Sequence, residues 1–186
     1  IPVYIDKPIA LNLSDLDTLY SLQQYPGQIF SCSALKYSEN FKLDIKTLDD
    51  LGKIKEIHAI TPKSWAKYSP HIIEPVLSIL GNKLSSKKIL ERRCSWSQKS
   101  GQSLAILYEN QILVRLFALG DINCPISVSL FGTKNSIALH PNDTFQSFKS
   151  ALEAFIDGIR TKTIKSTYEH HKKVVELIES GFFKNE

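Results

Sequence analysis

The first 35 residues alternate between short apolar runs and a helical pattern. Residues 1–5 and 28–34 are rich in β-branched and aromatic side chains, which is typical of buried parallel strands. Between them, apolar residues recur at helical spacing behind Ser14, which has N-cap chemistry with Asp17 three positions further on. The pattern predicts one βαβ unit. A parallel pair of strands cannot cover both of its faces, so this unit is expected to be the edge of a larger open sheet.

From about residue 51, several extended runs follow one another with few helical patterns between them, which indicates antiparallel pairing. Two pairs of runs are separated by short turns and predict hairpins, the clearest being the pair around Glu109-Asn110. We expect a sheet of five or six strands at least. The predicted strands cover residues 54–60, 89–96, 103–108, 111–119, 124–131 and 136–139.

Two amphipathic helices are predicted to close the chain, over about residues 143–159 and 166–181. The first carries a phenylalanine-rich stripe, which we expect to pack in the core, and it is interrupted near Gly158. The second begins with a capping box of Ser166 and Glu169. Its two adjacent histidines lie among lysines, so we expect them on a solvated face.

Composition excludes several classes of protein. The chain has 186 residues, 42% hydrophobic and 23% charged, which excludes fibrous and largely disordered classes. A net charge of +4 does not indicate a nucleic-acid partner, and the apolar runs are far shorter than the roughly 20 residues that a bilayer requires. Three widely spaced cysteines favour a reducing, cytoplasmic location. Because the chain lacks methionine even at its start, we expect it to be part of a longer translation product.

Two short segments are candidates for chemistry, while no glycine pattern predicts a phosphate loop and no ligand spacing predicts a metal site. The first is Asp6-Lys7-Pro8, directly after the first predicted strand. Open α/β sheets bind ligands at the carboxyl ends of their strands, so Lys7 is expected to point into a crevice. The alternative is a strand-end turn with a solvated lysine.

The second segment covers residues 65–75, with a helix predicted from about Ser69. A helical projection places the apolar residues on one arc and His71 and Glu74 on the opposite arc. At this i, i+3 spacing the imidazole and the carboxylate can hydrogen-bond, which would orient the ring and favour its protonated form. The alternative is a surface pair without a catalytic role.

These segments belong to an ordered set that resembles the carboxyl-terminal part of the glucose-fructose oxidoreductase, inositol dehydrogenase and MocA family (Gfo/Idh/MocA). Residues 3–10 resemble its (V/F)-x-x-E-K-P-(L/I)-A segment, with Asp6 in place of the usual glutamate. Residues 51–54 and 131–133 are similar to the start of its large sheet and to a late hairpin. The end of the chain is similar to its closing helices.

The resemblance implies an α+β fold: an open, mostly antiparallel β-sheet with helices packed on one face, preceded by a residual βαβ edge of a Rossmann domain. Residues 1–35 would be the remnant of the nucleotide-binding domain, and residues 36–186 a substrate-binding and oligomerisation domain. The full-length parent would bind NAD or NADP and form a homo-oligomer through the open sheet. This chain lacks the dinucleotide fingerprint, so we expect no tight cofactor binding to it alone.

The family's activity implies that the parent transfers hydride between a sugar- or polyol-type hydroxyl substrate and nicotinamide. By resemblance, Lys7 holds the reacting hydroxyl and, with Pro8, contacts the cofactor, while His71 is the general base. The expected substrate-binding residues are Lys36, Lys67, Tyr68 and Glu74.

One departure from the family motivates a narrower hypothesis. The frequent aspartate four residues before the histidine is Lys67 here, and a lysine opposes an imidazolium where an aspartate would support it. A substrate that carries a carboxylate or a phosphate would suit this change. Two other hypotheses stay open: a non-catalytic family member that uses the sheet as a binding or oligomerisation module, and an unrelated α+β binding domain.

Overall fold

The amino-terminal segment forms a parallel pair of strands joined through a helix. The structure, a computed structural model, describes residues 1–81, 87–94 and 101–182. β1 (Val3–Ile5) pairs in parallel with β2 (Ile29–Ser31), and α1 (Leu13–Ser21) connects them, so the predicted βαβ unit is present. The helix begins earlier than predicted, because the side chain of Asn12 rather than Ser14 accepts the amide of Asp15.

The second sheet has six strands in the order β4-β5-β6-β3-β7-β8. Its neighbouring strands are antiparallel except β3 and β6, and the open, mostly antiparallel α+β fold is thereby confirmed. The parallel pair arises because helices carry the chain across the sheet between β3 and β4. The predicted strand end at Trp96 lies outside the described residues. The strands are β3 (Ile54–Thr61), β4 (Lys87–Cys94), β5 (Gln102–Tyr108), β6 (Leu113–Ala118), β7 (Ser127–Gly132) and β8 (Ser136–Leu139).

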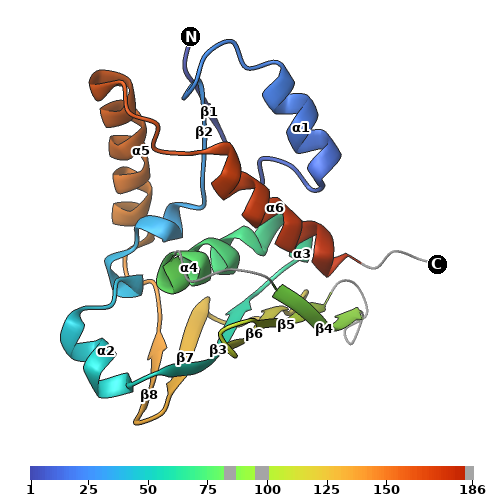
Figure 1. The fold of residues 1–186 in the computed structure, drawn as a ribbon, viewed down its shortest axis with the longest axis vertical. Helices are drawn as coiled ribbons and strands as arrows, with labels where there is room; N and C mark the ends of the chain where they lie inside the picture. Colours follow the sequence, from blue (N-terminus) through green and yellow to red (C-terminus); the bar gives the residue numbers. More distant parts are fainter. Residues whose placement is uncertain (82–86, 95–100, 183–186) are drawn as a thin grey trace.

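Helices cover one face of the six-stranded sheet and separate it from the small sheet (Figure 1). The covering helices are α3 (Trp65–Tyr68), α4 (Pro70–Leu80) and α6 (Tyr168–Gly181), while α2 (Ile45–Leu51) lies against β7. Two 3-10 helices, η1 (Ala34–Tyr37) and η2 (Glu39–Phe41), lead from β2 to α2. The core between sheet and helices includes Ile57, Ile72, Ile73, Leu104, Leu116, Leu130 and Ile178, all fully buried.

α5 (Thr144–Thr161) departs from the prediction in two ways. It continues through Gly158 without interruption. It packs on the small sheet only through the side that contains Ala151 and Phe155, against Tyr4 and Phe30. Ala151 and Phe155 of the predicted core stripe are thus packed, whereas its other five residues are exposed. In the described part of the chain the small sheet is only two strands wide, which limits the surface that α5 can cover. The exposed residues are Phe145, Phe148, Leu152, Ile156 and Ile159.

The N-cap of α6 is Thr167 rather than the predicted Ser166, whose hydroxyl serves another contact. Ser166 Oγ donates to the carbonyl of Ser31 (2.9 Å) and lies 2.5 Å from His171 Nε2. His171 is buried, so its predicted position on a solvated face is wrong. Its Nε2 donates to the same Ser31 carbonyl (2.9 Å), and Nδ1 accepts from the hydroxyl of Tyr20 (2.6 Å). This neutral imidazole therefore joins α1, β2 and α6.

The end of α6 fixes the start of α3 by close packing. Trp65 is fully buried and its Nε1 donates to the carbonyl of Ile178 (2.9 Å), and a Cβ added at Gly181 would overlap its indole ring.

We expect Gly181→Ala to lower the free energy of unfolding by about 2 kcal/mol, although alanine favours helices by about 1 kcal/mol. Urea unfolding measures this, with Ser180→Ala as the control. An unchanged unfolding midpoint in Gly181→Ala would contradict the packing.

Candidate functional site

Lys7 follows the carboxyl end of β1, and its side chain extends towards α3. Its Nζ donates to the carbonyl of Lys67 (2.8 Å) and lies 4.9 Å from the centroid of the Tyr68 ring. The peptide bond between Lys7 and Pro8 is cis. Partial burial is the main cause that lowers the pKa of the Lys7 ammonium. The structure therefore brings Lys7, Lys67 and Tyr68 together.

Tyr68 is the ring at which the candidate residues meet. Lys63 Nζ donates to its phenol oxygen at 2.6 Å, and this hydrogen bond lowers the pKa of Tyr68. An ammonium has no acceptor, so the phenolic proton must point elsewhere. The His71 ring packs edge-on against Tyr68, with centroids 5.3 Å apart. Sequence reasoning missed Lys63, since a lysine between a strand and a helix has no distinguishing pattern.

His71 lies in the first turn of α4 and takes its hydrogen bond from the segment after β2. Its Nδ1 is 2.8 Å from Ser33 Oγ, which also accepts the amide of Leu35 (3.3 Å). The second lone pair of this hydroxyl can accept the Nδ1 proton, and Nε2 is then the nitrogen that can take up a proton. Burial, and next the charge of Lys7, lower the pKa of His71 to about 4. The imidazole is thus neutral near pH 7. The expected hydrogen bond to Glu74 and the favoured imidazolium were both wrong.

Glu74 is buried and belongs to a neighbouring cluster. Its Oε1 accepts the amide of Ser33 (2.5 Å), and its Oε2 lies 3.3 Å from His170 Nε2. Lys36 Nζ lies 3.3 Å from the same nitrogen, and the His170 side chain is 21% exposed, so it is partly buried rather than fully solvated. His71 and Glu74 do not bind each other, because Glu74 accepts the amide of Ser33 and His71 bonds to the hydroxyl of Ser33. Lys36 and Glu74 therefore connect to His71 only through Ser33.

We call Lys7, Lys63, Lys67, Tyr68 and His71 the Tyr68 cluster. It offers ammonium groups that can bind an alkoxide oxygen, a phenolic proton that can be donated, and a neutral imidazole that can accept a proton. Such a set can bind an oxygen substituent and move a proton to or from it. Among the described residues, no three His, Cys, Asp or Glu side chains gather in a way that could hold a metal.

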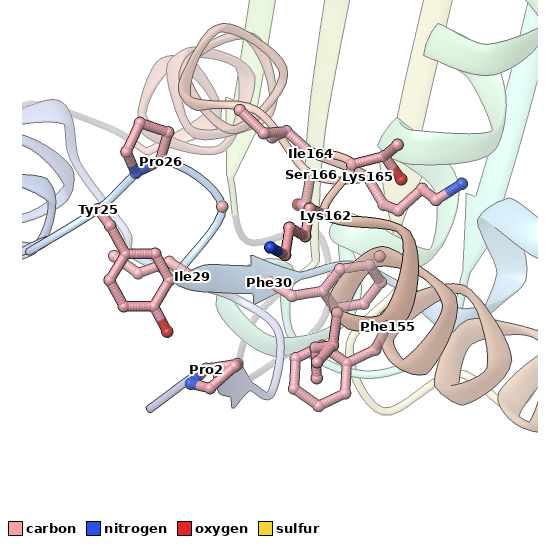
Figure 2. A pocket seen from close by; sticks show the side chains of 14 residues that line it. Pro2, Tyr25, Pro26, Ile29, Phe30, Phe155, Lys162, Ile164, Lys165 and Ser166 are labelled. Carbon is pink, nitrogen blue, oxygen red and sulfur yellow. The ribbon is translucent and has the colours of Figure 1, made fainter.

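Two pockets lie away from this cluster. One, of about 370 Å³, opens at the amino ends of β1 and β2, where Pro2, Ile29, Phe155 and Ile164 line it (Figure 2). Lys7 follows the opposite end of β1, so this mostly apolar pocket is not the candidate site. The other, of about 520 Å³, lies on β5 and β6 and includes Arg115 in its lining. No helix in the described part of the chain is long and apolar enough to cross a membrane.

Comparison with known proteins gives the fold. No protein-family model and no curated protein sequence matches the chain. It is similar to myo-inositol 2-dehydrogenase from Lactobacillus plantarum, with a TM-score of 0.74 and 10% identity over 96% of this chain and 69% of that one. For GenD2 from gentamicin A biosynthesis, in complex with NAD, the TM-score is 0.75 and the identity 11%, over 97% and 68% of the chains.

A third solved structure agrees with these. KijD10, a 3-ketoreductase from Actinomadura kijaniata in complex with TDP-benzene and NADP, has a TM-score of 0.77 and 10% identity, over 96% of this chain and 68% of that one. In each case nearly the whole of this chain matches about two thirds of a longer chain. The chain therefore has the fold that its resemblance to the carboxyl-terminal part of Gfo/Idh/MocA oxidoreductases predicted.

Two histidines with lowered pKa values, the half-buried His71 and the buried His171, predict a pH dependence of stability. In the unfolded chain a histidine binds a proton below about pH 6.5, whereas His71 and His171 in the folded chain do so only near pH 4, where burial places their pKa values. Acid therefore favours the unfolded chain between these values. We expect the free energy of unfolding to fall over this range, by up to about 1.4 kcal/mol per pH unit for each histidine.

Urea unfolding at a series of pH values measures this slope. His71→Gln and His171→Gln should each flatten it, while His140→Gln, at an exposed position, should leave it unchanged. A slope that stays the same when both His71 and His171 are replaced would show that they are not held neutral.

Proposed function

We propose that this chain is the carboxyl-terminal, substrate-binding portion of an NAD(P)-dependent oxidoreductase that acts on a sugar- or polyol-type hydroxyl compound. The observation that carries the proposal is the meeting of Lys7, Tyr68 and His71 beyond the carboxyl end of β1. Ligands of open α/β sheets bind at this end of the strands. The shared fold with myo-inositol 2-dehydrogenase and with the NADP complex of KijD10 supports the same reaction class.

Two surfaces support a neighbouring nucleotide-binding domain. Among the described residues β1 is paired along one edge, and the outer stripe of α5 is apolar and exposed. Further parallel strands beside β1 and helices over α5 would cover both. We assign residues 1–35 to the edge of such a Rossmann domain and residues 36–186 to the substrate domain. NAD or NADP bound there would accept hydride from the substrate carbon.

The residues of this chain would then divide the work. Lys7 Nζ binds the oxygen of the reacting hydroxyl and stabilises the negative charge that develops on it. His71 accepts the hydroxyl proton: its ring is unprotonated near pH 7, because burial and the charge of Lys7 hold its pKa at about 4. The same low pKa makes it a weaker base than a free imidazole, so the reaction also needs Lys7 to stabilise the developing alkoxide. Ser33 orients the imidazole through Nδ1. The carbon–hydrogen bond breaks towards the nicotinamide, and the proton leaves through His71.

The test is turnover by the complete gene product that contains this chain. We expect reduction of NAD or NADP, followed by absorbance, with at least one member of a panel of sugars, polyols and sugar acids. Lys7→Ala and His71→Ala should each lower kcat by about 100-fold or more, because each removes a group that contacts the reacting atoms. Lys46→Ala removes an exposed lysine of α2 and should leave kcat unchanged.

The alternative, a non-catalytic binding or oligomerisation module, has its own signature. The complete protein would then bind nicotinamide without turnover of any compound in the panel, and Lys7→Ala would not alter binding. That outcome would overturn the enzymatic proposal.

We also propose that the protein forms a homo-oligomer through the open face of the six-stranded sheet. His58 on this face lies 5.0 Å from the Phe131 ring and 6.3 Å from the Phe117 ring, between centroids. Beside them, Glu56 accepts hydrogen bonds from His58 (2.7 Å) and Arg115 (2.9 Å). Among the described residues no helix covers this face. Exposed aromatic side chains beside paired charges are typical of a protein–protein interface.

Phe131→Asp tests this surface, since Phe131 lies on it and is 38% exposed. We expect light scattering to show a multiple of the 21.0 kDa chain mass for the unchanged protein and the monomer mass for Phe131→Asp. Ile45→Asp makes the same apolar-to-acidic change at an exposed position on α2 and should keep the oligomer. A monomer at all concentrations of the unchanged protein would refute the proposal.

A further inference from the structure

The Tyr68 cluster is more cationic than hydride transfer from a neutral polyol requires. We propose that the substrate bound there carries an anionic group, a carboxylate or a phosphate, and that Lys63 and Lys67 bind this group beside the hydroxyl held by Lys7. The inference rests on the proposed function and names the substrate class of the same site.

The charges around Tyr68 are unbalanced. Lys7 Nζ and Lys63 Nζ lie 4.9 Å and 4.6 Å from the centroid of the Tyr68 ring. Lys67 precedes Tyr68 in α3 and is exposed, and its positive charge lowers the pKa values of both Lys7 and Tyr68. The negative charge of Asp6 raises the pKa of Lys7, whereas the charges of Lys63 and Lys67 lower it. Three ammonium groups and one carboxylate leave an excess of positive charge, which an anion would neutralise.

The hydrogen-bonding groups of the cluster are mostly donors. Lys63 uses one of its protons on the Tyr68 oxygen, and this leaves the phenolic proton and the remaining ammonium protons to be donated outwards. Each hydroxyl of a neutral polyol also donates a hydrogen bond, so a site for such a compound needs acceptor groups. The oxygens of a carboxylate or phosphate only accept, and they bind charged donors in strong hydrogen bonds. The donor-rich cluster therefore fits an anion better.

The backbone at Lys63 is a second, independent indication. Lys63 has φ +63°, in the left-handed region that favours glycine or asparagine over a lysine. Two hydrogen bonds to Gly120 hold it there, from the Lys63 amide (2.7 Å) and from the Gly120 amide (3.0 Å). A lysine at a position where glycine would be less strained indicates that its side chain has a task of its own. The ammonium on the Tyr68 oxygen is positioned by this turn.

The experiment is isothermal titration calorimetry on the 186-residue chain, so that no cofactor is required. The probes are gluconate, which carries a carboxylate, glucose 6-phosphate, which carries a phosphate, and the neutral compounds glucose and myo-inositol. We expect at least one anionic probe to bind more tightly than both neutral ones and to weaken as salt is added. Which anionic probe binds distinguishes the two sources of charge.

Two variants separate a binding role from a structural one. Lys63→Gly should weaken the anionic probe by about 10-fold, the loss expected for one charged hydrogen bond, while its melting temperature stays the same or rises because the left-handed residue becomes glycine. A residue with only a structural role would lower the melting temperature as well. Lys46→Ala removes an equal charge from an exposed position on α2 and should not alter binding.

Equal affinity for neutral and anionic probes, no binding of any anionic probe, or full affinity in Lys63→Gly would each overturn the inference. None of these results affects the proposed hydride transfer, since a neutral substrate would still use Lys7 and His71. Conversely, anion binding to this chain without turnover by the complete protein would remove the oxidoreductase and keep the anion site.

Discussion

The arrangement of the site depends on Ser33, which binds α4 through two groups at once. Its amide donates to the buried Glu74 carboxylate and its hydroxyl binds His71 Nδ1. A buried carboxylate without such donors costs several kcal/mol, so the chain that leaves β2 is held against the helix. Because β2 pairs with β1, the same contact fixes where Lys7 lies relative to His71. One serine thus fixes the position of the small sheet relative to α4.

The other side of the small sheet is fixed by a second neutral imidazole. His171 receives a hydrogen bond from Tyr20 of α1 and gives one to the backbone of Ser31 in β2. α6 carries it and also packs on Trp65, the first residue of α3. Lys67 and Tyr68 follow in that helix. Lys67, Tyr68 and His71 therefore stand on helices that buried contacts hold in place.

Periodicity predicted the strands, both hairpins and α4, because those features depend on neighbours in sequence. It failed where the partner is distant in sequence. The spacing of His71 and Glu74 permitted a mutual bond, and only folding brings Ser33 between them. The stripe of α5 showed that one face is apolar but could not show what covers it. Lys63 had no sequence signal, since its backbone angle and its contact with Tyr68 exist only in the folded chain.

The exposed apolar stripe of α5 also affects the tendency of the isolated chain to aggregate. Five apolar side chains of α5 are exposed, and in the described part of the chain the outer edge of the neighbouring β1 has no strand partner. An open strand edge next to an apolar surface is a template on which other chains can add strands. We therefore expect the α5 stripe and the edge of β1 to control the aggregation and crystallisation of the isolated polypeptide. A charged substitution on the exposed side of α5 is the first change to make when the polypeptide is produced.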